Sequence, residues 1–286
     1  MSLILMYITN NLDVALIAQK YGVQRIWVDL ETLGKEERQK GLNTVKSKHK
    51  ISDIAHISPY LDKSEMLVRI NPWNNESIQE IDAVIDAGAD IIMLPMWKSE
   101  QEVKKFIEAV DGRIRTTLLL ETKESVECID KVLEIPGIDE IHKGLNDLHL
   151  SYGMMFMFEL LSNGVVEALC DKFKKIGIPY GFGGIARIGE GALPAEKIVM
   201  EHYRLGSSRV ILSRTFCNLE ELGTLEEVEK IMKENIYKLR NYENSIINMS
   251  EEEFLTNKED VHSCVEGVKE MIRRRKKSEV EQRSDC

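Results

Sequence analysis

The sequence has few of the residues that hold small secreted or metal-stapled domains together. It contains five cysteines in 286 residues, an odd number, widely scattered and without CxxC spacing. This pattern argues against both a disulfide framework and a zinc site. We expect the thiols to be reduced and to have no role in function.

Long apolar runs and a basic charge balance are also lacking. The apolar stretches are short and interrupted by charge, so we expect no membrane span. The opening segment MSLILMYITNNLD has no basic leader and no small-residue cleavage site, and it is interpreted as a first strand in a cytoplasmic protein. A formal net charge of −10 gives no electrostatic reason to expect nucleic acid as a partner.

What the sequence does contain is an alternation of short aliphatic runs with longer amphipathic stretches. Apolar residues make up 43% of the chain, enough for a sizeable core. The pattern is typical of βα units in a parallel sheet. The eight runs begin at Leu3, Arg25, Met66, Ile91, Thr116, Glu140, Pro179 and Arg209. Eight units predict a (β/α)₈ TIM barrel over residues 1–240, although a doubly wound open sheet would show the same alternation.

The character of the sequence changes near residue 241, which predicts a helical C-terminal extension over residues 241–286. Ser250 and Glu253 form a capping-box pattern at its start. Apolar residues then follow at helical spacing, at Val261, Val265, Val268 and Met271. The basic run from Arg273 is too short to predict a membrane or nucleic-acid site. We expect the final residues to be disordered.

In a parallel barrel the active site lies at the carboxyl ends of the strands, so polar residues that end apolar runs are the candidates. A single acid at such a position is commonly the N-cap of the next helix, and Asp29 and Asp147 taken singly fit that role. The candidates are Asp29, Glu31, Arg69, Asn71, Glu121, Thr122, Asn146, Asp147, Gly183, Gly184, Ser213 and Arg214.

Two of these acids favour a different interpretation when they are taken together. Glu121 and Asp147 end successive runs at matching positions, 26 residues apart, so their oxygens can converge on one cation. Oxygen-only ligands favour Mg²⁺ or Mn²⁺ over zinc. Arg69, inside the apolar run LVRIN, could neutralise an enolate oxygen when a bond next to a 2-oxo acid breaks.

Five motifs in order, VDLE, LVRINP, AGADIIMLPM, LLLETKESV and GLNDLHLSYG, resemble the HpcH/HpaI aldolase and citrate lyase β-subunit family over roughly residues 20 to 220. The resemblance implies a (β/α)₈ barrel, a Mg²⁺ or Mn²⁺ ion and a homo-oligomer. It also implies reversible aldol or Claisen-type carbon–carbon cleavage through an enolate.

Carried over by motif, the resemblance implies that Glu121 and Asp147 bind the metal and that Arg69 is catalytic, binding a substrate oxygen. The backbone amides around Asn146 and Asp147 match those that hold the pyruvate carboxylate. The substrate-binding residues are predicted to be Glu31, Asn71, Pro95, Gly144 and Asn146.

The sequence departs from the aldolase pattern at the general base. Pyruvate aldolases of the family place a histidine directly after DLE, where this chain has Thr32. His49 or His56 could supply the imidazole, and we take His49 as the catalytic candidate, with a surface histidine as the alternative. Lys35 and Arg38 instead resemble the citrate lyase-like branch, which handles acyl thioesters.

Two further alternatives remain open. Lys143 stands where the family has an apolar or aromatic residue, and a Schiff-base lysine there would make a metal-free aldolase. Gly183, Gly184 and Arg187 could bind a phosphoryl group, or the glycines could serve only a tight turn.

The prediction is therefore a metal-dependent carbon–carbon lyase acting on pyruvate, another 2-oxo acid or an acyl thioester. The alternative is a barrel that has lost its general base and binds a phosphorylated or 2-oxo acid metabolite as a regulatory or scaffold subunit.

Overall fold

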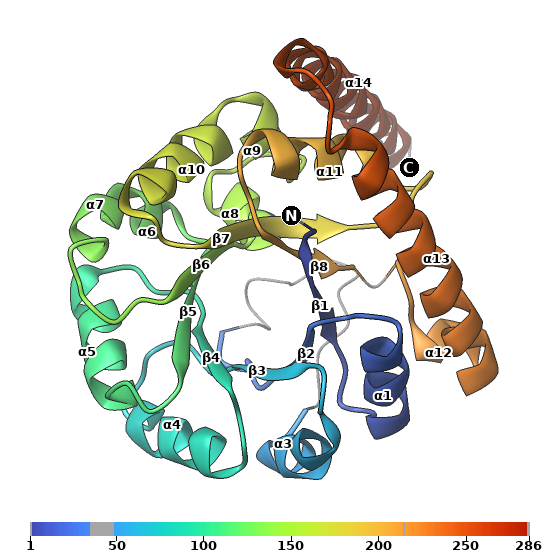
Figure 1. The fold of residues 1–286 in the computed structure, drawn as a ribbon. Helices are drawn as coiled ribbons and strands as arrows, with labels where there is room; N and C mark the ends of the chain where they lie inside the picture. The colour runs from blue at the N-terminus through green and yellow to red at the C-terminus, as the bar shows by residue number, and fades with distance from the viewer. Residues whose placement is uncertain (1, 35–48, 214, 285–286) are drawn as a thin grey trace.

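The strands of the protein close into a parallel barrel, as the count of eight runs predicted (Figure 1). The computed structural model describes residues 2–34, 49–213 and 215–284. Each strand pairs with the next, and β8 pairs with β1, which rules out the open sheet. The strands are β1 (Ile4–Ile8), β2 (Arg25–Asp29), β3 (Glu65–Arg69), β4 (Ile91–Leu94), β5 (Arg115–Leu120), β6 (Glu140–Lys143), β7 (Tyr180–Ile185) and β8 (Arg209–Leu212).

Helices form a ring around the strands. Several begin where a side chain accepts a hydrogen bond from the first turn, as Asn11, Ser99 and Thr122 do. They are α1 (Leu12–Lys20), α3 (Ile51–Ile57), the 3₁₀ helix η1 (Ser58–Tyr60), α4 (Ser77–Asp86), α5 (Glu100–Val110), α6 (Lys123–Glu127), α7 (Ile129–Val132), α8 (Leu145–Ser151), α9 (Glu159–Ser162), α10 (Val165–Ile176), α11 (Ala195–Arg204), α12 (Leu219–Leu222), α13 (Leu225–Ile246) and α14 (Glu251–Ser284).

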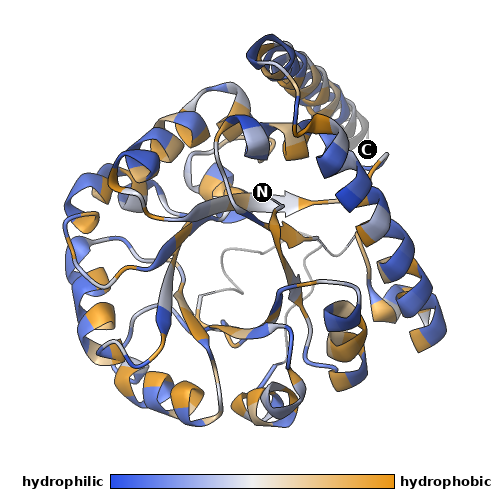
Figure 2. Cartoon of the chain, in the orientation of Figure 1, coloured by the Kyte–Doolittle hydropathy of each residue, from blue (hydrophilic) through white to orange (hydrophobic). Residues whose placement is uncertain are grey.

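The strands are buried on both faces, and the two faces belong to different apolar clusters. The larger cluster fills the layer between strands and helices, and the outer helices carry apolar and polar stripes accordingly (Figure 2). A small second cluster fills the middle of the barrel, built from Met6, Trp27, Leu67, Ile91, Met93 and Leu119. The interior is therefore a packed core and not a pore.

Below this apolar layer, at the amino ends of the strands, the barrel interior carries a buried ion network. Both terminal nitrogens of Arg25 donate to the Glu140 carboxylate, each at 2.6 Å. Arg209 forms an ion pair with the same carboxylate. Glu65 accepts from Arg25 at 3.2 Å and from Arg115. Burial raises the pKa of Glu140, but its arginine partners outweigh burial and lower the pKa to about 2.

The C-terminal part confirms the capping box and corrects the extent of the apolar face. Ser250 N donates to Glu253 at 2.7 Å, and Glu253 N donates to the Ser250 hydroxyl at 3.3 Å. Val261 and Val265 are buried, but Met271 is 63% exposed, because the packed face of the helix runs from Val268 to the half-buried Ile272 and leaves Met271 beside it. The predicted domain boundary at residue 240 stays a prediction; α13 runs across it and α14 begins at Glu251.

The sequence also predicted disordered final residues and no membrane span. The predicted disorder of the final residues falls partly on 285–286, which lie outside the described residues. Among the helices that the structure describes, none combines the length and apolar character that crossing a bilayer requires.

Candidate active site

The carboxyl end of the barrel interior gathers polar side chains from strands far apart in sequence. Successive residues of a strand face opposite sides, so Arg25, Trp27 and Asp29 of β2 all face inward. On β3 the same alternation turns Leu67 and Arg69 inward. The interior is therefore charged at its amino end, apolar in the middle, and acidic with one arginine at the mouth.

Arg69 is held by two carboxylates from the end of β2. Its Nε donates to Asp29 Oδ1 at 2.8 Å and its Nη2 to Asp29 Oδ2 at 2.9 Å, a bidentate pair. Its Nη1 lies 3.2 Å from Glu31 Oε2. Burial lowers the pKa of Arg69, but Asp29 and Glu31 outweigh it and the net shift is upward, so the guanidinium stays charged. Asp29 is therefore an arginine partner, a role that the N-cap interpretation missed.

Glu121 follows β5 and is 2% exposed. Its Oε1 accepts from the N–H of Met96 at 3.1 Å, and Met96 has a positive φ of 53° that aims this N–H. A Cβ on Gly144 would lie 2.7 Å from Glu121 Oε2, so glycine is required at that position. Burial, and then the charges of Glu31 and Asp147, raise the pKa of Glu121 well above its usual range, against the effect of Arg69.

Asp147 and Asn146 lie half-buried in the first turn of α8, the helix that starts directly after β6. The N-cap of this helix is Gly144, so Asp147 is not the cap. The charge of Asp147 acts on Glu121, so the two carboxylates belong to the same group of charges at the carboxyl end of the barrel. The predicted role of Asn146 at a substrate carboxylate stays a prediction.

The donor set at the mouth fits a hard divalent cation. Within the described residues, no group of three or more His, Cys, Asp or Glu side chains is arranged to hold a metal. Two carboxylates suffice for Mg²⁺, which keeps several water ligands. The charge of Asp147 acts on Glu121, and a cation between two carboxylates offsets such repulsion.

Asn71 and Pro95, both predicted to bind substrate, are placed differently. Asn71 Oδ1 accepts from the N–H groups of Thr32 at 2.9 Å and Leu33 at 3.1 Å, while its Nδ2 donates to Glu80 at 2.8 Å. Its side chain thus fixes the segment after β2 that carries Glu31. Pro95 is buried after β4, next to the Met96 N–H that Glu121 accepts.

His49 lies close to the Asp29–Arg69 pair. Its Nδ1 accepts from Asp29 N at 3.0 Å, so the neutral ring carries its proton on Nε2. To act as a general base, His49 would have to give up this hydrogen bond, either to free Nδ1 or to move its proton to Nδ1 and free Nε2. His56 lies on the exposed side of α3. Lys35 and Arg38, which favoured the citrate lyase-like branch, lie outside the described residues.

Lys143 faces away from the barrel interior. Its Nζ donates to Cys170 of α10 at 3.3 Å and lies over the rings of Phe173, Tyr180 and Phe182 at 4.8, 4.6 and 5.6 Å. These residues belong to the layer between sheet and helices. The structure therefore gives the Schiff-base alternative no support.

Replacing Lys143 with Met is expected to leave the fold equally or more stable, by up to about 1 kcal/mol, because it removes a buried cation while keeping the volume. Burial lowers the pKa of Lys143. The unfolded chain then binds more protons between the two pKa values, so wild-type stability rises with pH in that window. Urea unfolding across alkaline pH should show this slope in wild type and lose it in the variant. Borohydride trapping of a pyruvate adduct on Lys143 would contradict this assignment.

The glycines of β7 serve a bulge. The pairing of β7 with β8 shifts between Gly181 and Gly184, and Gly183 between them has a φ of +54°. Arg187, the other half of the predicted phosphate site, donates from Nε to Phe216 O at 2.9 Å. These contacts favour the turn interpretation, and Arg214 lies outside the described residues.

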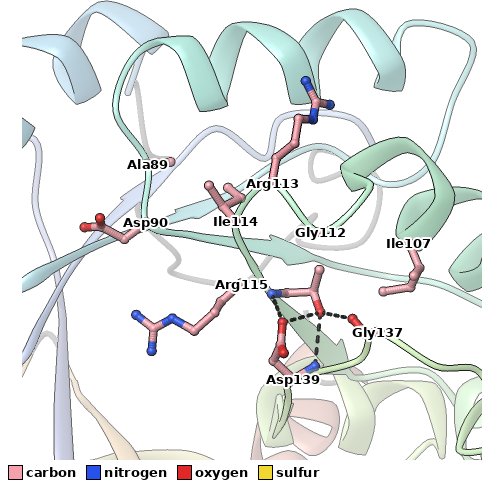
Figure 3. Close-up of a pocket in the computed structure, with 10 residues that line it drawn as sticks. Ala89, Asp90, Ile107, Gly112, Arg113, Ile114, Arg115, Gly137 and Asp139 are labelled. Carbon is pink, nitrogen blue, oxygen red and sulfur yellow. Dashed lines mark hydrogen bonds between the residues drawn. The ribbon is translucent and has the colours of Figure 1, made fainter.

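A pocket of about 520 Å³ lies at the opposite end of the barrel from this site (Figure 3). Its walls include Arg115, the first residue of β5, and Asp139, which directly precedes β6. Asp139 accepts from the N–H of Thr116 at 2.8 Å, a contact that closes the loop entering the strand. The pocket is therefore a feature of the strand entrances.

The strands and the mouth residues define a (β/α)₈ barrel with a buried arginine and carboxylates at the carboxyl end of its strands. A family model described as HpcH/HpaI aldolase/citrate lyase matches residues 4–157, more than half of the 286-residue chain. The chain belongs to the HpcH/HpaI aldolase/citrate lyase family. A comparison with curated protein sequences finds no match.

Solved structures support the fold at low sequence identity. An HpcH/HpaI aldolase from Desulfitobacterium hafniense DCB-2 is 17% identical, with a TM-score of 0.57 over 74% of this chain and 86% of that one. A family protein from Burkholderia cenocepacia J2315 is 13% identical, with a TM-score of 0.59 over 79% and 95%. The citrate synthase SbnG is 17% identical, with a TM-score of 0.56 over 74% and 87%.

Proposed function

We propose that the protein is a divalent-metal-dependent carbon–carbon lyase. It cleaves or forms the bond next to a 2-oxo acid or acyl group through an enolate. The observation that carries the proposal is the buried mouth cluster, in which Arg69 is fixed by Asp29 and Glu31 while Glu121 feels the charges of both Glu31 and Asp147. Family membership supports lyase chemistry at this site.

Each side chain of the cluster has a distinct part in the proposed reaction. Glu121 and Asp147 would hold Mg²⁺ or Mn²⁺, which supplies Lewis acidity to the carbonyl oxygen of the substrate. Asp29 orients Arg69, so that its guanidinium stabilises the negative charge that develops on the enolate oxygen. Gly144 leaves room beside Glu121, and Met96 N orients that carboxylate.

The fate of the proton separates the two functions that the chain could have. Thr32 replaces the expected histidine, and its N–H and hydroxyl bond to Asn71, with the hydroxyl at 3.3 Å. Nδ1 of His49 is already engaged with Asp29 N. These contacts are the observation behind the second candidate, a barrel that binds a phosphorylated or 2-oxo acid metabolite without turnover. The proposed lyase needs either a His49 that releases Asp29 N or a water molecule that carries the proton.

Proton–deuterium exchange at the pyruvate methyl group tests the proposal without knowledge of the acceptor. We expect exchange that requires Mg²⁺ or Mn²⁺, disappears with chelator, and falls at least about a hundredfold in Asp147→Ala, because one of two protein ligands is lost. Asp130→Ala removes an exposed acid on α7 and serves as the control. NMR would follow the methyl signal.

The outcomes divide the candidates. No exchange with pyruvate, but metal-dependent exchange at the methyl group of an acetyl thioester, would assign the citrate lyase-like branch. Metal binding without any exchange would favour the binding-only barrel. No metal affinity at all would overturn the proposed lyase.

A further inference from the structure

The first half of α14 is docked on helices that follow β6 and β7 in the chain (Figure 1). Asn257 Nδ2 donates to Lys197 O of α11 at 3.1 Å and to the buried Glu201 Oε1 at 3.0 Å. Lys258 Nζ donates to Glu167 of α10 at 2.7 Å. Val261 is buried in the same interface. The helix therefore has a fixed position on the barrel wall.

One contact of α14 is with Glu159 of α9, the residue that holds the loop before that helix. Lys269 Nζ lies 3.3 Å from Glu159 Oε2, at the start of α9, and the side chains are 16% and 14% exposed. The other oxygen of Glu159 accepts from the N–H groups of Met155 at 2.8 Å and Phe156 at 2.9 Å. Burial raises the pKa of Glu159, but these hydrogen bonds and Lys269 outweigh it and lower the pKa. Glu159 thus joins the loop to the C-terminal helix as a carboxylate.

The loop held by Glu159 is the direct continuation of α8, the helix that carries Asp147. Met154 N donates to His149 O at 2.9 Å, which links the loop to the last turn of α8. At the end of that helix, Ser151 Oγ accepts from Lys123 N at 2.8 Å, two residues after Glu121. The placement of α8 is therefore tied to the start of α6, just after Glu121, on one side and to α14 on the other.

We propose that Lys269 is a positioning residue for the candidate active site, so that α14 sets the placement of α8 and of Asp147 through Glu159 and the loop 152–158. Both Glu159 and Lys269 lie outside the residues 4–157 that the family model matches. The inference rests on the proposed function in one respect, the role of Asp147 in holding the cation. The path from α14 to α8 stands on one ion pair, Lys269–Glu159, and on the hydrogen bonds that link Glu159 to the loop and the loop to α8.

The test compares three variants of the full chain. Lys269→Met removes the contact with Glu159, and Lys269→Arg keeps the charge. Lys258→Met removes a similar α14 ion pair, to Glu167, that does not lead to α8. We would measure Mn²⁺ affinity by electron paramagnetic resonance, backbone amide exchange in residues 145–160, and urea unfolding.

Lys269→Met is expected to raise the Mn²⁺ Kd about tenfold, within the range seen for outer residues that orient metal ligands. It should also speed amide exchange at Met155 and Phe156 and along α8, and Lys269→Arg should restore both. Lys258→Met should leave both unchanged at a comparable loss of stability.

Two results would overturn the positioning role: equal weakening of Mn²⁺ binding by Lys258→Met, or α8 amide exchange unchanged in Lys269→Met. Absence of Mn²⁺ affinity in the wild-type protein would instead contradict the proposed metal-dependent lyase. In that case the amide exchange still decides whether α14 controls α8.

Discussion

Replacing Arg69 with Met is expected to lower the rate of pyruvate methyl exchange by about a hundred- to a thousandfold, the usual effect of removing one preorganised donor to a developing oxyanion. The arginine is 12% exposed and bidentate to Asp29. Its loss also removes the cation that both Asp29 and Glu31 contact among the described residues. We therefore expect a stability loss of about 3–5 kcal/mol as well.

Arg69→Lys separates these two effects. Lysine retains the positive charge but not the planar fork that matches a carboxylate. It should recover much of the stability, measured by urea unfolding, and little of the exchange rate, measured by NMR. Wild-type exchange in Arg69→Lys would show that the charge alone is sufficient and would contradict the proposed orientation by Asp29.

The second large effect is expected at the other end of the barrel. Glu140→Gln leaves Arg25 and Arg209 buried at 1% and 3% exposure without their shared carboxylate. We expect a loss of about 3–5 kcal/mol in the free energy of unfolding. Glu65→Gln is the matched control, since Glu65 pairs with Arg25 and Arg115 but is 39% exposed, and about 1 kcal/mol is expected there.

The pH dependence gives the Glu140 prediction a second readout. The folded-state pKa of Glu140 is about 2, below the unfolded value. Its contribution is therefore fully present above the unfolded pKa of about 4.3 and is lost as pH falls toward 2. Urea midpoints should fall with acid in wild type and less steeply in Glu140→Gln. Equal acid sensitivity in both proteins, or a change in the metal affinity of the folded variant, would contradict this separate structural role.

The parts of this architecture that sequence could predict are those written in local patterns. Eight aliphatic runs with intervening amphipathic stretches predicted the strand count, which the closed barrel confirms. Asp29 and Arg69 were candidates because each lies at the end of a run, and the structure pairs them. Glu121 and Asp147 were singled out because each follows an apolar run, and the charge of Asp147 acts on Glu121. Their role as metal ligands stays a prediction.

The parts that sequence could not predict depend on distant partners or on a shift of one residue. Lys143 ends β6, and a shift of one position decides whether a side chain faces the barrel interior or the helices. The fixing of Asn71 by Glu80 and of His49 by Asp29 N arises between separate elements. Spacing alone did not show that the packed face of α14 continues from Val268 to Ile272 and leaves Met271 exposed, because steps of three and of four residues both fit one helix face.

The distribution of charge along the barrel axis has a consequence for the order of ligand arrival. Among the described residues, four carboxylates, Asp29, Glu31, Glu121 and Asp147, lie at the mouth with Arg69, while the arginines of the ion network lie at the far end. On the proposed function, this field would draw in the dication first and would repel an anionic acid until the dication has entered. By reciprocity, the acid must then tighten the hold on the dication by the same factor. On the proposed function, occupancy by substrate would follow the free concentration of the cation.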